Sequence, residues 1–272
     1  MTLSDLDSDG PAFIVIAIIA FTMIFLQHLI NKHPINKEPR GGSDLISFQM
    51  SMIGTLYAVT LGLIMVDASN KFDNTKKSVS DEANKLLQIY AISSGVPDAH
   101  GIVLRRTIKS YANEVRDIEW GLLGSTRYSK KAKSDFHDLI QIATTIKVDN
   151  DEQSIIIQEI MDLLMEAWSS RRGRIDFEGY VIPRIEWVGL ISGGIVVLLF
   201  PFFVARRSDG LPGALMTGLY TFIVTTNLYL VFAFDSPFTG SLRVPNTSFS
   251  NLIEYIDTHP PETNNSGLVK QK

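Results

Sequence analysis

The sequence predicts an all-α, polytopic membrane protein in which two transmembrane hairpins flank a helical extramembrane domain. Three observations support this fold class. Hydrophobic residues make up 45% of the 272 residues and charged residues only 20%, and the apolar residues gather in long runs. Four of these runs reach the roughly 20 residues that a helix needs to cross hydrocarbon. Between the second and third runs, apolar residues recur at helical spacing and no strand pattern appears.

The four runs form two pairs, each joined by a short connection. We expect spans at residues 12–30 and 45–66 in the first hairpin, and at 185–205 and 211–234 in the second. Residues 1–11 form an acidic tail that lacks Lys and Arg. Because a signal peptide begins with basic residues, we interpret the first run as a retained span.

The short connections set the expected orientation. The positive-inside rule counts Lys and Arg in short loops, and it places both connections in the cytoplasm. The N-terminus, the helical domain and the C-terminus then lie on the extracytoplasmic side of the cell (inner) membrane. The opposite orientation is the alternative. The basic residues concerned are Lys32, Lys37, Arg40, Arg206 and Arg207.

Residues 67–182 form the expected helical domain. No Gly or Pro interrupts the chain between Val66 and Ser93, so one helix is expected to continue from the second span into the domain. Breaks are expected at residues 93–98, 121–129 and 147–151. The apolar stripes are Phe72, Val79, Ala83, Leu86 and Tyr90; Leu104, Ile108, Tyr111, Val115, Ile118 and Leu122; Phe136, Ile140, Ala143 and Ile146; and Ile156, Ile160, Leu163 and Ala167.

The second hairpin, residues 183–235, is followed by two smaller segments. Residues 236–257 read as a turn and a short helix. Residues 258–272 are polar and contain proline, so we expect a disordered tail.

Composition excludes several functions. The chain has no Cys, which rules out disulfides and thiolate metal sites, and its net charge of -4 provides no basic excess for nucleic acid. No catalytic or nucleotide-binding motif is found, and the five His residues are scattered without the spacing of a metal site. We therefore expect no enzyme activity, no cofactor and no metal.

One face of the second span consists of small or weakly polar residues. Small residues let helices pack closely in lipid, which is the first interpretation. The second is that the face lines a wet pathway, where hydroxyl groups replace part of the hydration shell of an ion. The residues are Ser47, Ser51, Gly54, Thr55, Ala58 and Gly62.

A tightly specified turn follows the fourth span. Asp235 ends the span, Pro237 and Gly240 are expected to turn the chain, and Phe238 is expected to anchor in the headgroup region or in a cleft. A carboxylate at the membrane interface is less costly when a guanidinium group pairs with it. We therefore expect Asp235 to form a structural clasp with either of two arginines, Arg184 or Arg243.

The alternative to the clasp is a charged vestibule. It would include Asp67, which closes the second span, together with Asp235 and the arginines. Arg171, Arg172 and Arg174 are close in sequence and would favour anions, whereas Asp117 and Glu119 would favour cations. The sign of such a vestibule stays open.

Glu119 and Trp120 are the candidates within the helical domain. The first interpretation is a contact between helices, with Trp120 packed, Glu119 hydrogen-bonded and Trp168 as a possible counterpart. A role in binding a ligand is the alternative.

Several short sequence motifs, which serve as landmarks, follow one another between residues 45 and 257. In order and spacing these landmarks resemble the bestrophin-like family of bacterial membrane proteins, a domain family of unknown function. They are IGTLYAVTLGLIMV (53–66), the Glu82–Ala83 pair, LLQIY (86–90), YANEVRDIEWGLLG (111–124), RRGR (171–174), Pro183 and Trp187, ALMTGLYTFIV (214–224) and DSPFTGSLRV (235–244).

The resemblance implies a distant relation to bestrophins, which are pentameric anion channels whose second helix lines the pore. The closing D-x-P-F-x-G-x-x-R-V is its most specific part. Two features depart from bestrophins: their segment between the second and third spans is cytosolic, and their acidic calcium clasp is not found in this sequence.

Three functions follow from these observations. The first is an oligomeric ion channel or pore lined by the second span, with an inorganic ion as the possible ligand. The others are a non-enzymatic structural or scaffolding protein, and a sensor, whose extracytoplasmic domain binds a partner. In each case we expect a homo-oligomer in the lipid bilayer.

Overall fold

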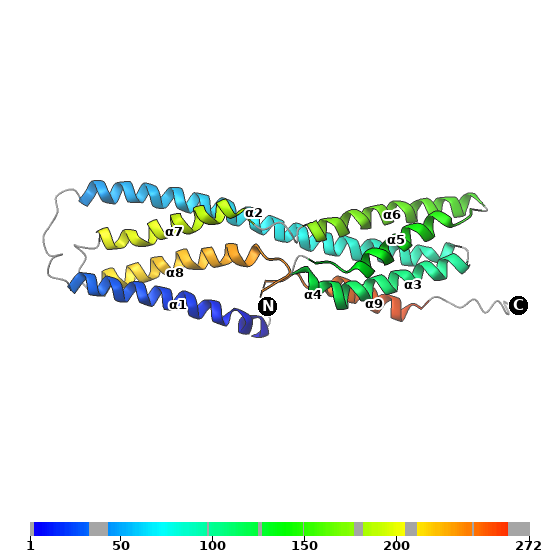
Figure 1. Ribbon diagram of the computed structural model, residues 1–272, viewed down its shortest axis with the longest axis horizontal. Helices are drawn as coiled ribbons and strands as arrows, with labels where there is room; N and C mark the ends of the chain where they lie inside the picture. Colours follow the sequence, from blue (N-terminus) through cyan, green and yellow to red (C-terminus); the bar gives the residue numbers. More distant parts are fainter. Residues whose placement is uncertain are drawn as a thin grey trace, which may run out of the picture. The chain divides into compact units, whose positions relative to one another are not determined.

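The computed structural model describes residues 3–32, 43–96, 98–124, 127–148, 150–176, 182–204, 211–240 and 242–260 (Figure 1). Every regular element within these ranges is helical, so the all-α prediction is confirmed. The basic residues Lys37, Arg40, Arg206 and Arg207 and the tail after residue 260 lie outside the described residues. The α-helices are α1 (Leu3–Lys32), α2 (Ser43–Ile92), α3 (Asp98–Glu114), α4 (Trp120–Leu123), α5 (Lys130–Thr145), α6 (Asp151–Asp176), α7 (Arg184–Val204), α8 (Leu211–Phe234) and α9 (Thr247–Thr258).

The chain divides into two compact units. Unit 1 consists of Met1–Phe72 and Val181–Arg243, and unit 2 of Asp73–Tyr180 and Val244–Lys272. Helices α1, α7 and α8 belong to unit 1, and α3, α4, α5, α6 and α9 belong to unit 2. Helix α2 contributes to both, as the absence of Gly and Pro after the second span predicts.

All or part of each candidate membrane span lies in unit 1. Four helical stretches are long and apolar enough to cross a membrane: Gly10–Ile30, Phe48–Gly95, Arg184–Phe202 and Leu211–Phe234. They begin in α1, α2, α7 and α8, and each overlaps one of the four predicted spans, although the stretch that begins in α2 continues well beyond residue 66. Helix α1 begins at Leu3, so the acidic start of the chain is already helical. The chain is a multi-pass membrane protein.

Small residues allow the helices of unit 1 to approach one another. On α7, a Cβ atom added to Gly193 would lie only 2.7 Å from Cδ2 of Tyr57, and one added to Gly194 would lie 2.9 Å from its hydroxyl oxygen. Tyr57 projects from α2 and donates its hydroxyl hydrogen to the Leu190 carbonyl at 3.1 Å. The two glycines thus receive the Tyr57 ring. On α8, Gly218 accommodates Ile24 of α1 in the same way.

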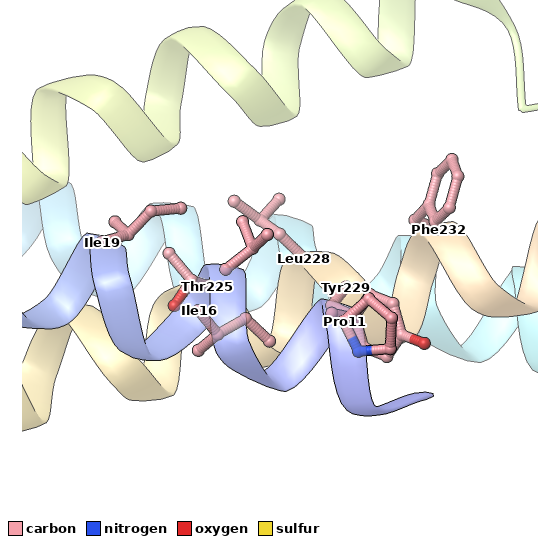
Figure 2. Close-up of a pocket in the computed structure, with 9 residues that line it drawn as sticks. Pro11, Ile16, Ile19, Thr225, Leu228, Tyr229 and Phe232 are labelled. Carbon is pink, nitrogen blue, oxygen red and sulfur yellow. The ribbon is translucent and has the colours of Figure 1, made fainter. Parts of the chain in front are cut away.

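A groove of about 480 Å³ lies between α1 and α8 (Figure 2). Its walls are almost entirely apolar, and the Thr225 hydroxyl donates to the Thr221 carbonyl at 2.7 Å. The groove therefore offers apolar contacts and no reactive group. Its lining residues are Pro11, Ala12, Val15, Ile16, Ile19, Thr225, Leu228, Tyr229 and Phe232.

Unit 2 is a helical domain with one apolar core. Its helices are amphipathic, and the faces that the sequence marks as apolar are the faces that become buried. Helix α9 joins this core rather than ending the chain as a separate segment, because its inward face is fully apolar. The fully buried side chains include Leu86, Ile89, Leu104, Ile108, Tyr111, Phe136, Leu139, Ile160 and Phe249.

One predicted stripe is wrong at its end. We expected Ile118 and Leu122 to face the core, but Ile118 is 52% exposed, whereas Glu119 and Leu123 are buried. The cause is a π-helical turn at Val115–Glu119, inserted between α3 and α4. A π-turn carries about one residue more than an α-turn, so the inward face moves on by one residue.

Candidate functional site

The small-residue face of α2 is exposed over its described length. Ser51, Thr55, Ala58 and Gly62 are all exposed, and Gly54 is partly exposed. A Cβ atom added to Gly54 or Gly62 would meet no other atom within 4 Å. Among the described residues, no helix of this chain packs on the face. The side chain of Ser47, the remaining predicted member, lies outside the described residues.

Helix α2 carries two further faces in the same segment. Tyr57, Leu61 and Ala68 are buried and belong to the core of unit 1, about a quarter of a turn away from the small-residue face. On the other side of that face, six large apolar side chains are exposed. These are Phe48, Met52, Leu56, Val59, Leu63 and Val66. The small-residue face is thus bordered on one side by a protein core and on the other by an apolar surface.

The helix itself orients the Thr55 hydroxyl group on this face. The Thr55 hydroxyl donates to the Ser51 carbonyl at 2.9 Å. Its oxygen keeps lone pairs that point away from the backbone, so the exposed surface offers hydrogen-bond acceptors.

The turn after α8 is formed as its residues suggest, but the partners of Asp235 differ from our expectation. Oδ1 of Asp235 accepts a hydrogen bond from the Ile182 N–H at 2.6 Å, and Oδ2 accepts one from the Trp187 indole N–H at 3.3 Å. Neither Arg184 nor Arg243 forms an ion pair with it among the described residues. Two neutral donors at the start of α7 take the place of the expected guanidinium.

Two other residues of the turn have a defined conformation or burial. Gly240 has a φ of 77°, the left-handed conformation that favours glycine. Phe238 is buried, at 9% exposure, so it packs against protein and not in open surroundings. The turn therefore closes on itself by packing and by the hydrogen bonds of Asp235.

The remaining boundary charges do not gather in unit 1. Asp67 pairs with Lys71, one turn further along α2. Arg184 and Arg243 are exposed. No described contact brings these three residues to Asp235, and the charged vestibule stays a prediction.

A buried ionic network lies in the core of unit 2. Two arginines of α6, Arg171 and Arg174, meet Glu119 at the end of the π-turn and Glu82 of α2. Glu119 receives two parallel hydrogen bonds from Arg171, both at 2.8 Å, and a third from Arg174 at 2.8 Å. Arg174 donates from Nε and Nη2 to Glu82 at 2.7 and 3.1 Å. The four charges sum to zero, as a buried cluster requires.

Two neutral groups complete the network. The Tyr111 hydroxyl donates to Oε1 of Glu82 and accepts from Nη1 of Arg171 at 2.7 Å. The backbone N–H of Ser129 donates to Glu119 at 3.0 Å. Glu82, Tyr111, Glu119 and both arginines are at most 1% exposed.

The network shifts the protonation equilibria of its members. Burial raises the pKa of Glu119, but hydrogen bonds from Arg171 and the charge of Arg174 outweigh burial, so the pKa lies below its ordinary value. Burial and the neighbouring charge of Glu82 raise the pKa of Tyr111 well above its ordinary value. The Glu119 carboxylate thus stays ionised and the Tyr111 phenol stays neutral near pH 7.

This geometry changes our expectation for three residues. Arg171 and Arg174 are buried and paired, so they are not available to concentrate anions; only Arg172 of that cluster is exposed. Trp120 stacks edge-on against Phe249 at 6.1 Å, whereas Trp168 packs against Phe136 at 5.1 Å. The aromatic partner of Trp168 is thus Phe136, whereas we expected Trp120.

Sequence reasoning missed the network, although its signal was present. Glu82 lies within the apolar stripe of α2, between Val79 and Leu86. Arg171 and Arg174 continue the stripe of α6 after Ala167 at helical spacing. An acid on one inward face and bases on another indicate a buried pair.

The comparison with protein families bears on the whole chain. The Bestrophin-like domain matches residues 13–249. The chain belongs to the Bestrophin-like family. No curated protein matches it.

Solved structures share the fold of this Bestrophin-like chain. A mutant of a bacterial bestrophin homologue from Klebsiella pneumoniae has a TM-score of 0.67 and 12% identity, over 89% of this chain and 99% of that one. Another structure of that homologue has a TM-score of 0.65 and 13% identity, over 87% of this chain and 97% of that one. A mutant described only as a membrane protein has a TM-score of 0.67 and 10% identity, over 89% of this chain and 98% of that one. At such low identity the likeness shows the fold alone.

Three landmarks of the Bestrophin-like resemblance meet in the buried network. The Glu82–Ala83 pair supplies Glu82, and YANEVRDIEW supplies Tyr111 and Glu119. RRGR supplies both arginines. Segments that are far apart in the sequence are thus linked by one set of hydrogen bonds.

Proposed function

We propose that this Bestrophin-like membrane protein assembles as a homo-oligomer that conducts an inorganic ion, with the small-residue face of α2 lining the pathway. The observation that carries the proposal is the exposure of Ser51, Thr55, Ala58 and Gly62 on one face of a membrane-spanning helix, with no helix packed on it in the part of the chain that the structure describes.

Chemistry supports this use of the face. Leu, Phe and Val side chains are expected where a helix faces lipid, and α2 presents them on a separate face. Hydroxyl and backbone oxygens on the small-residue face can replace part of the hydration shell of an ion. In a single copy the described residues leave this face uncovered. A closed pathway therefore needs several copies around an axis.

Flux measurements test the proposal. We expect proteoliposomes containing the wild-type protein to pass potassium or chloride, measured separately, and Thr55→Trp to reduce that flux at least tenfold. Leu56→Trp is the matched control, because Leu56 is the next residue on α2 and lies on the apolar surface. Wild-type protein that is folded and oligomeric yet impermeable to both ions would contradict the proposal and favour a scaffold or sensor.

Cysteine accessibility separates a pathway from helix packing. The chain has no Cys, so each introduced thiol is the single reactive site. We expect a charged thiol reagent to modify Ser51→Cys quickly and Met52→Cys slowly in the liposome-embedded oligomer. Equal protection of both would indicate that the face is packed against another copy and dry.

A further inference from the structure

We infer that residues 115–123 form a two-register segment, in which the pairing of Glu119 with Arg171 and Arg174 holds a π-turn that would otherwise relax to a regular α-helix. In the π register, which the structure shows, Glu119 and Leu123 face the core. In the α register, Ile118 and Leu122 would face it. The inference concerns unit 2 and is independent of the proposed pathway on α2.

The sequence is compatible with both registers. Ile118 and Leu122 continue the apolar stripe of α3 without a break, which is the pattern of a regular amphipathic helix. The structure instead leaves Ile118 52% exposed and buries the carboxylate of Glu119 completely. A charged residue inside and an apolar residue outside is the reverse of what burial alone favours. Some specific interaction must therefore select the π register.

The ionic network supplies that interaction. Glu119 accepts hydrogen bonds from Arg171, Arg174 and the Ser129 N–H. If it turned outward, two buried arginines would face only Glu82, which would leave one positive charge without compensation. The π-turn is thus the backbone adjustment that places the second carboxylate between the arginines.

The segment is short enough to change register. The backbone angles are helical up to Glu114 before the turn and again at Trp120 after it. The turn therefore inserts one residue into a continuous helix. That helix ends at Leu123, four residues after the π-turn. A shift of one residue therefore moves a single turn of helix. Such an element converts a change of charge in the core into the exposure or burial of Ile118.

Charge substitution tests the inference. In the double variant Glu119→Lys/Arg171→Leu, the π register buries an uncompensated cation, whereas the α register leaves a neutral Glu82–Arg174 pair inside. We expect a thiol at Ile118→Cys to react with a maleimide at least tenfold more slowly in this background than in the wild-type background. Val103→Cys is the matched control, because Val103 is similarly exposed on α3, before the turn. An unchanged ratio of the two rates in a folded variant would overturn the inference.

A deletion decides the question if the double variant does not fold. Deleting Ile118 removes the extra residue, so Glu119 keeps its partners in a regular α-helix. We expect the unfolding temperature of the full chain in detergent to fall by at most about 5 °C. Deleting Arg106, an exposed residue in the regular part of α3, displaces Leu104 from the core and is expected to lower it by more than about 10 °C. Equal losses would show that the π-turn is not a removable insertion.

Discussion

Individual side chains show how this chain compensates buried charge. Arg171 and Arg174 would each be costly inside a helical domain if unpaired. Two carboxylates neutralise them, and Tyr111 adds a hydroxyl group that both donates and accepts. We therefore expect the loss of any single charge to destabilise the protein more than the loss of one acid together with one base.

Substituting Arg174 tests this sensitivity. Arg174→Met leaves Glu82 and Glu119 facing one guanidinium, and we expect it to destabilise the protein by about 3 to 5 kcal/mol. Arg172→Met, two positions away on the same helix and exposed, should change stability by less than about 0.5 kcal/mol. Thermal unfolding in detergent measures both. A balanced Glu82→Gln/Arg174→Met variant should lose less than Arg174→Met alone, and the reverse order would contradict the account.

Asp235 provides a second test at this scale. Because its partners are the Ile182 N–H and the Trp187 indole, Asp235→Ala should cost about 1 to 3 kcal/mol, as two donors lose their acceptor. Asp235→Asn keeps one acceptor oxygen and should cost less. Arg184→Ala and Arg243→Ala should each change the unfolding temperature little. A loss in either arginine variant as large as that in Asp235→Ala would restore the expected clasp.

At the scale of the elements, close packing and helix register both depend on single residues. Helix α7 meets α2 where Gly193 and Gly194 receive the Tyr57 ring. The same helix carries Gly189, where an added Cβ atom would meet nothing within 4 Å. Glycines at similar spacing thus differ in whether a neighbouring helix needs them.

This difference predicts opposite results for two alanine substitutions. Gly193→Ala places a methyl group against the Tyr57 ring, and overpacking of this kind costs about 1 to 3 kcal/mol. Gly189→Ala should be neutral or slightly stabilising, because alanine favours the helix. Resistance to thermal unfolding in detergent compares them. Combining Gly193→Ala with Tyr57→Ala should remove the clash, so the double variant should lose less stability than the sum of the two single variants. A strictly additive loss of stability would argue against a clash between the added methyl group and the Tyr57 ring.

At the scale of the whole molecule, the order of segments determines which parts share a side of the membrane. The chain passes between unit 1 and unit 2 three times, after Phe72, after Tyr180 and after Arg243. From four spans in two hairpins, we predict that the two short connections share one side of the membrane and that unit 2 lies on the other. The positive-inside rule predicts that the connections are cytoplasmic.

Single cysteines test this topology. In intact inner-membrane vesicles of known orientation, Asn36→Cys should react with a membrane-impermeant thiol reagent only from the cytoplasmic side. Val148→Cys, exposed in unit 2, should react only from the other side. Reaction of both from the same side would refute the four-span arrangement, and the exchanged pattern would establish the opposite orientation.

The sequence alone determined the elements of this protein. Hydrophobic length located the spans, helical periodicity located the amphipathic helices, and ordered landmarks pointed to the family, because each of these signals is local or additive along the chain. Only the tertiary structure decided which side chains meet. It gave Asp235 two neutral donors, turned Ile118 outward, and joined Glu82, Glu119, Arg171 and Arg174, because pairing across distant segments depends on the packing of whole helices and on where one extra residue enters a turn.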